Sequence, residues 1–288
     1  MKSRVVIIDE MNPEKAVTKA LEEMEGLDGL FRGKHVAVKP NDTWASDDDN
    51  SACTRPDTLK GALRHIKHFN PRKITVTGGA GAGQTDKIFS LLGLDKVIRE
   101  EDVEFFDHNR GPFREVSLDH GPQKSVMVNP YVLEYDTVVS LAQHKVHDSA
   151  VVTLGLKNIA MSYPAADYYG HPRNKKEHPH NFFRDLHSFI AGMCARFTID
   201  LGIISGFPAM TGKGPIGGNA FDSGLVIAST DPVACDRIGS EVLGRGEAPY
   251  VRIAGELGLG RWELGDIDCY PLTLDEAKDI FTSRQSAS

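Results

Sequence analysis

Short runs of apolar, β-branched residues alternate along this chain with segments of helical periodicity, and this alternation constrains the fold more than any other feature. Four runs are typical of buried strands: RVVIID (4–9), KHVAVKPN (34–41), RKITVTGG (72–79) and DTVVSLAQHKVH (136–147). Helical patterns lie between them, as in NPEKAVTKALEEM (12–24) and RPDTLKGALRHIKHF (55–69). This order requires crossover connections, so it predicts an α/β fold with a mostly parallel sheet and helices on both faces. Three short runs within 103–129 predict a small β-rich insert.

The bulk properties limit the class of protein. The chain has 288 residues, enough for a single α/β domain over 1–288, with a weak candidate boundary near residue 131. Its net charge is −7 and it has no basic stripe, so nucleic acid is not an expected partner. No segment reaches the roughly 18 to 20 apolar residues of a membrane helix, and the first residues form a strand pattern instead of a signal peptide. We therefore expect a cytoplasmic protein with no membrane partner, and a homodimer as its assembly.

The cysteines give little support for a metal centre. Cys53, Cys194, Cys235 and Cys269 are far apart in the sequence. Zinc knuckles and ferredoxin-type clusters need closely spaced thiolates, so no 4Fe–4S cluster is expected. Each cysteine is interpreted as a small buried hydrophobic residue.

Polar residues follow the predicted strands, where parallel α/β proteins bind their ligands. These candidates are Lys39, Asn41, Gly79, Gly81, His144, Lys145, His147, Lys213, Gly214 and Asp231. Lysine is enriched among them although the chain as a whole is acidic. A local excess of positive charge predicts a small anionic ligand, either a carboxylate or a phosphate.

Two glycine-rich loops and one arginine could bind such an anion. The loop GGAGAG (78–83) lies between a strand and a helix, where backbone amides can cradle an anion; a plain tight turn is the alternative. The loop TGKGPIGG presents Lys213 beside exposed amides, or it is a surface loop. Arg55 could grip the anion with its planar guanidinium or form a surface salt bridge.

The strand over 136–147 ends in an unusual group of side chains. Alternation along a strand places Lys145 and His147 on one face and His144 on the other. His144 and His147 are also the candidate ligands for a divalent metal. The prolines of HPRNKKEHPHN (171–181) favour a mobile polar loop, or lid, over the site, and the alternative is a metal shared by His178 and His180.

A helix is expected directly after this strand. Asp148 or Ser149 would cap it. Thr153 and Lys157 would then lie four residues apart on one helical face. The apolar residues around them favour a protein-walled cleft over a solvated helix surface.

Four sequence blocks, KPN, HKVHDSAVVTLGLKN, GKGPIGG and STDPVACD, occur in an order that resembles domain-of-unknown-function family 362, from about residue 36 to 243. The resemblance places family positions on Lys39, Pro40, Asn41, Lys145, His147, Thr153, Lys157, Asn158, Gly212, Gly214, Pro215, Asp231, Pro232, Val233, Ala234 and Asp236. Many members of that family carry a ferredoxin-like iron–sulphur module. This chain lacks the cysteine run, so cluster binding is not carried over.

A fainter similarity joins residues 53–93 to the N-terminal region of the nickel-pincer lactate racemases. In those enzymes the arginine of a Thr-Arg-Pro sequence contacts cofactor phosphate, which implies that role for Arg55. The racemases have a histidine in the following loop, where this chain has glycines at 81 and 83.

Together these features predict an enzyme for a small anionic metabolite, either an isomerase or lyase or an oxidoreductase. Lys145 or Lys157 would hold the anion, and His147 would be the general acid or base. Asp231 or Asp236 would orient a lysine or hydrate a metal. The alternative is a protein that binds an anion or metal without chemistry. A third interpretation has the lysines scattered over separate faces.

Overall fold

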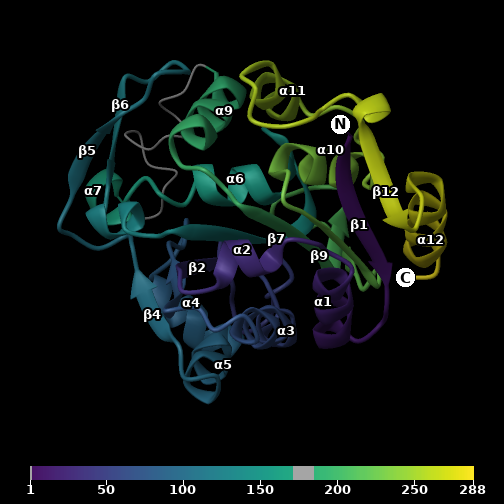
Figure 1. Ribbon diagram of the computed structural model, residues 1–288, viewed down its shortest axis with the longest axis horizontal. Coiled ribbons are helices and arrows are strands. Elements are labelled where there is room, and N and C mark those ends of the chain that lie inside the picture. The colour runs from purple at the N-terminus through teal and green to yellow at the C-terminus, as the bar shows by residue number, and fades with distance from the viewer. Residues whose placement is uncertain (1, 171–184) are drawn as a thin grey trace.

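The computed structural model describes residues 2–170 and 185–288, which form a ten-stranded sheet (Figure 1). Eight strands follow the order β12-β1-β11-β9-β7-β2-β3-β4, while β8 pairs with β7 and β10 with β9. The strands are β1 Ser3–Asp9, β2 His35–Pro40, β3 Lys73–Gly78, β4 Glu104–Asp107, β7 Thr137–His147, β8 Val151–Thr153, β9 Leu201–Thr211, β10 Asn219–Phe221, β11 Leu225–Ser229 and β12 Ile267–Pro271.

The strand directions confirm the mostly parallel sheet. Along the eight-strand path, five of the seven neighbouring pairs are parallel, and both antiparallel pairs involve β11. Seven strands therefore point one way, and β11 alone is reversed. The carboxyl ends of β2, β3, β4, β7 and β9 consequently meet at one edge of the sheet, which we call the carboxyl edge.

Helices cover both faces, as predicted (Figure 1). The core on one face receives buried residues from α1 Pro13–Glu22, α2 Leu27–Phe31, α3 Pro56–Lys67, α4 Thr85–Leu92 and α5 Leu94–Glu100. The core on the other face receives them from α6 Gly155–Ala160, α9 Leu186–Arg196, α10 Pro232–Val242, α11 Pro249–Glu256 and α12 Leu274–Ser286. The short helix α7 spans Ala166–Tyr169. None of the helices in the described ranges is both long and apolar enough to cross a membrane.

The β-rich insert is smaller than expected. Only β5 Arg114–Ser117 and β6 Ser125–Val128 form it, as a separate antiparallel pair. The preceding run forms β4, which pairs in parallel with β3 at the edge of the main sheet. Phe105 explains this placement, because its ring packs on Phe89 of α4 with centroids 4.7 Å apart.

The prediction that a helix begins directly after β7 is wrong. Residues 148–150 turn the chain into β8, which pairs back onto β7, and α6 begins only at Gly155. Thr153 is therefore a strand residue opposite Lys145 and not a helical neighbour of Lys157. Two consecutive valines before Thr153 favour a strand over a helix. Val151 has a φ of 69° and is the central residue of a γ-turn, in which Val152 N donates to Ala150 O at 2.8 Å. This turn is tight and strained.

Candidate functional site

Five of the predicted residues come together at the carboxyl edge. We call Lys39, Asn41, Lys145, Lys157 and Asn158 the lysine cluster. Each of them is at most 5% exposed. Asn41 is the hub, because its side chain accepts a hydrogen bond from Lys145 Nζ at 3.2 Å and donates one to Asn158 Oδ1 at 3.3 Å. These bonds join Asn41, Lys145 and Asn158 in one network, and Asn158 also bonds the backbone oxygen of Lys39.

Lys39 is neutralised within the protein. Its Nζ donates to Asp42 Oδ1 and to Pro40 O, both at 2.6 Å. The second oxygen of Asp42 accepts the amide of Gly79 at 2.7 Å. A Cβ at position 79 would overlap the ring of His108, so only glycine fits there. The amide expected to bind an external anion thus already holds the protein's own carboxylate.

Lys145 lies fully buried at the end of β7. Its Nζ donates to Ala52 O at 2.6 Å as well as to Asn41. Burial lowers its pKa to about 8, although the carboxylate of Asp42 opposes that shift. An ammonium has three donors, so one of them is not used by these two bonds.

Lys157 differs from the other two buried lysines. Within residues 2–170 and 185–288, no hydrogen bond or ion pair reaches its Nζ. Burial, followed by the positive charge of Lys145, lowers its pKa to about 7. Lys157 directly precedes Asn158, whose side chain bonds Asn41, the partner of Lys145.

Asp236 and Asn158 hold α6, the helix that carries Lys157. The buried carboxylate of Asp236 accepts the amides of Gly155 at 2.7 Å and Leu156 at 3.0 Å, at the start of that helix. Burial raises the pKa of Asp236 to about 7, against the effect of these amides. Asn158 donates to Lys39 O at 2.9 Å and to Ser140 Oγ at 3.1 Å. Asp236 is therefore a positioning residue for α6.

Two buried polar atoms beside Lys145 have no hydrogen-bond partner among the described residues. They are Oγ1 of Thr153 and Oε1 of Gln143. Thr153 lies opposite Lys145 in the β7–β8 pair, which puts their Cβ atoms about 5 Å apart. Gln143 precedes Lys145 by two residues, and both side chains reach the 51–52 segment. Buried polar atoms are nearly always bonded, so these two atoms are unused hydrogen-bonding groups close to Lys145 in the sheet.

His147 is held by the turn that follows it. Its Nδ1 accepts the amides of Ser149 at 3.1 Å and Ala150 at 3.2 Å. Two N–H groups aimed at Nδ1 assign the ring proton of the neutral histidine to Nε2. Of the acid and base roles expected for His147, this geometry favours proton donation.

A shared metal at His144 and His147 does not fit the structure. His144 bonds Gly239 O at 2.8 Å and packs against Phe281, on the face of β7 opposite Lys145. Burial lowers the pKa of His144 to about 4. In the part of the chain that the structure describes, no three His, Cys, Asp or Glu side chains form a metal-binding group. His171, His178 and His180 lie outside the described residues.

Three predicted site residues have other partners or face the surface. Arg55 is half exposed and forms an ion pair of 2.8 Å with Asp222. Lys213 is exposed on the loop between β9 and β10. Asp231 is the N-cap of α10, and it also binds the amide of Arg261 at 2.8 Å. Because β11 is reversed, its carboxyl end brings Asp231 to the edge opposite the cluster.

Of the two remaining glycines, Gly214 has a packing role and Gly81 does not. A Cβ at Gly214 would overlap Val146 O, and the Gly214 amide donates to Asp148 Oδ1 at 3.1 Å. A Cβ at Gly81 would lie 3.7 Å from Thr43 O, so that position tolerates a side chain. Gly214 thus ties the β9–β10 loop to the end of β7.

The sequence interpretation missed Asp42, Gln143 and His108. Asp42 directly follows Asn41, and Gln143 continues the alternation of Lys145 and His147 one step back, so both were within reach of the pattern. His108 follows β4, a strand that the sequence pattern places in the insert. It bonds Thr77 Oγ1 at 2.8 Å and Ser162 Oγ at 2.9 Å, and so joins the ends of β3 and α6.

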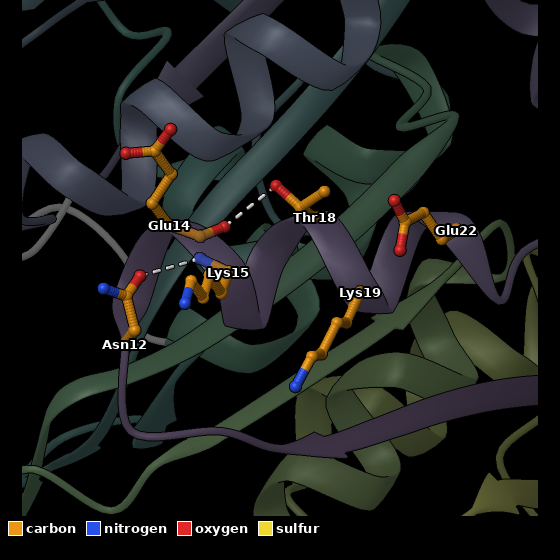
Figure 2. A pocket seen from close by; sticks show the side chains of 6 residues that line it. All are labelled: Asn12, Glu14, Lys15, Thr18, Lys19 and Glu22. Carbon is orange, nitrogen blue, oxygen red and sulfur yellow. Dashed lines mark hydrogen bonds between the residues drawn. The ribbon is translucent and has the colours of Figure 1, made fainter.

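A surface groove on α1 is separate from the lysine cluster. It is lined by Asn12, Glu14, Lys15, Thr18, Lys19 and Glu22 (Figure 2). Asn12 caps the helix through Lys15 N at 2.9 Å, and Thr18 bonds Glu14 O at 3.0 Å. These polar groups serve the helix itself.

Known proteins resemble this chain in sequence and in structure. It is 22% identical over 242 residues to a thylakoid-associated protein of Synechocystis, covering 83% of this chain and 73% of that protein. A lactate racemase apoprotein structure from Thermoanaerobacterium thermosaccharolyticum matches with a TM-score of 0.45 and 14% identity. That match covers 83% of this chain and 57% of the racemase chain, so this chain spans little more than half of the racemase. The family model for the domain of unknown function DUF362 matches residues 36–241, which confirms the predicted family. The chain therefore belongs to the DUF362 family.

Proposed function

We propose that this protein is an enzyme acting on a small anionic metabolite, with Lys145 binding the anion, Lys157 as the base and His147 as the proton donor. The observation that carries the proposal is Lys157, which is 5% exposed, has no hydrogen-bond partner among the described residues, and directly precedes Asn158 in the network that joins Asn41 and Lys145. Two cationic side chains packed together out of water are unfavourable unless an anion joins them.

An anion fits the donors that remain. Asp42 is committed to Lys39 and to the amide of Gly79, so it does not neutralise Lys145. One donor of Lys145 and the hydroxyl of Thr153 remain for a carboxylate or phosphate oxygen. Gln143 Oε1 offers an acceptor for a hydroxyl group of the same ligand.

The protonation states support acid–base chemistry. With a pKa of about 8, Lys145 stays mostly charged at pH 7, whereas Lys157, with a pKa of about 7, is half neutral. A neutral amine accepts a proton, and His147 Nε2 carries one to donate. A base and an acid near one anion suit isomerisation, or the addition or elimination of water beside a carboxylate.

Thermal unfolding tests the anion site. Malonate and phosphate should raise the unfolding midpoint above that in sodium chloride of equal ionic strength. A ligand at 100 times its Kd adds about 2.7 kcal/mol. Lys145→Met should remove the effect, and Lys96→Met, which alters an exposed lysine of α5, should keep it. If malonate and phosphate raised the unfolding midpoint of Lys145→Met and Lys157→Met as much as that of the wild type, the anion site would be ruled out.

A further inference from the structure

We propose that Lys157 is a covalent nucleophile that forms an imine with an anionic ligand carrying an aldehyde or ketone next to its carboxylate. This inference rests on the proposed function, because Lys145 would hold the carboxylate of that ligand. It goes further by naming a bond and a class of ligand.

The isolation of Lys157 is the first support. Lys39 and Lys145 each donate two hydrogen bonds to oxygen acceptors. Lys157 is 5% exposed and has no acceptor within the described ranges. A buried cation without acceptors loses its proton more readily than one that is hydrated or paired.

The neighbouring charge is the second support. Burial, and after it the positive charge of Lys145, lowers the pKa of Lys157, as burial and a neighbouring cation do in amine-catalysed decarboxylation sites. A neutral primary amine at neutral pH is a nucleophile, whereas an ordinary surface lysine is almost fully protonated. With a pKa of about 7, the neutral fraction at pH 7 is on the order of 10³ times that of a surface lysine.

The unpartnered oxygens are the third support. Thr153 Oγ1 is buried opposite Lys145 and can donate to a carbonyl oxygen of the ligand. Gln143 Oε1 can accept from the carbinolamine hydroxyl that follows. A 2-oxo acid presents a carboxylate and a carbonyl on adjacent carbons, which matches a cation and a hydroxyl on paired strands.

The step balances without an oxidant or reductant. The lone pair of Lys157 Nζ attacks the carbonyl carbon, an N–C bond forms and the C=O π electrons move to oxygen. That oxygen takes up a proton, and the nitrogen gives one up, to yield the carbinolamine. A second proton on the hydroxyl lets water leave, and the nitrogen lone pair forms the C=N bond of a protonated imine.

Reductive trapping tests the imine. The full-length protein is incubated with glyoxylate or pyruvate and sodium cyanoborohydride at pH 7, and intact mass and peptide mapping locate the adduct. We expect one adduct per chain on Lys157, at least about tenfold above any surface lysine. Lys157→Arg and Lys157→Met should lose the adduct, and Lys96→Met should keep it.

The outcomes separate this inference from the proposed function. Adducts spread over surface lysines and unchanged in Lys157→Met would overturn the imine. If malonate still stabilises the protein through Lys145 in that case, the anion site stands and only the covalent step fails. If malonate has no Lys145-dependent effect either, both fail. Lys145→Met should keep the Lys157 amine yet lose the preference for pyruvate over acetone, which has no carboxylate.

Discussion

Lys39 and Asp42 form an ion pair of 2.6 Å at the end of β2, with both side chains buried. The pair joins two loops, because Asp42 also binds the amide of Gly79 after β3. The lysine of the Lys-Pro-Asn motif is therefore part of a structural clamp beside the lysine cluster, and we propose that Lys145 and Lys157 contact the ligand.

Loss of the Asp42 carboxylate should destabilise the fold strongly. Asp42→Asn leaves the Lys39 ammonium buried without a counter-charge, and breaking a buried pair in this way costs about 3 to 5 kcal/mol. Urea unfolding measures the change. Asp28→Asn is the matched control, since Asp28 pairs with Arg32 on the surface, where solvent screens the pair, and should change stability far less. Equal effects of the two substitutions would contradict the clamp.

Lys157 should make stability depend on pH in a defined direction. The pKa of an unperturbed lysine is 10.5, and that of Lys157 in the folded protein is about 7, so the unfolded chain binds more protons between those values. The free energy of unfolding contributed by Lys157 therefore rises as pH increases from 7 to 10. Relative to Lys157→Met, the wild type should be less stable at pH 6, and the gap should narrow toward pH 10.

Urea midpoints at pH 6, 7, 8 and 9 measure this difference, and Lys96→Met controls for loss of a surface charge. If the urea midpoints of the wild type and of Lys157→Met changed in parallel with pH across the whole range, the pKa of Lys157 would not be perturbed. Lys145 has a folded pKa of about 8, so its contribution to the free energy of unfolding should also rise with pH, over a narrower pH range.

The tautomer of His147 can be measured directly. The ¹⁵N shifts of its ring at neutral pH should identify Nε2 as protonated, because Nδ1 accepts the amides of Ser149 and Ala150. His147→Asn keeps an acceptor near the position of Nδ1, whereas His147→Gln does not. The Gln variant should therefore lose about 1 to 3 kcal/mol of stability, and more than the Asn variant. A proton found on Nδ1 would contradict the assignment.

The Asp236 carboxylate should determine the order of α6. Asp236→Asn sets an N–H group against the amide of Leu156 or Gly155, which costs about 1 to 3 kcal/mol. Hydrogen exchange of these two amides should accelerate as well. Asp279→Asn, on the exposed side of α12, should change stability by about 0.5 kcal/mol at most. Unaltered exchange at the start of α6 would exclude the positioning role.

Val151 should carry backbone strain next to the site. Its φ of 69° is unfavourable for a β-branched residue. Val151→Gly relieves the strain and Val151→Ala does not, while both remove the side-chain packing. The glycine variant should be more stable than the alanine variant by about 1 kcal/mol in urea unfolding. If alanine is the more stable of the two, the turn is not strained.

Local patterns in the sequence were enough for most elements and for the class of fold. The caps at Asn12 and Asp231 and the stop at Gly93 all form as local chemistry predicts. β7 spans Thr137–His147 and carries Lys145 and His144 on opposite faces, because side-chain alternation depends only on the strand itself. The parallel sheet then brought Asn41, Lys145 and their neighbours to one edge.

The sequence by itself determined the alternation of strands and helices and the residues that follow each strand, because both depend on neighbours within a few positions. Only the tertiary structure decided which of those residues meet. The reversal of β11 sent Asp231 to the far edge, and the turn at 148–150 made Thr153 a strand partner of Lys145. Asp42 forms an ion pair with Lys39, and Asp236 bonds the amide of Gly155 at the start of α6, 81 residues away in the sequence. These choices depend on contacts between distant segments, whose energies no local pattern contains.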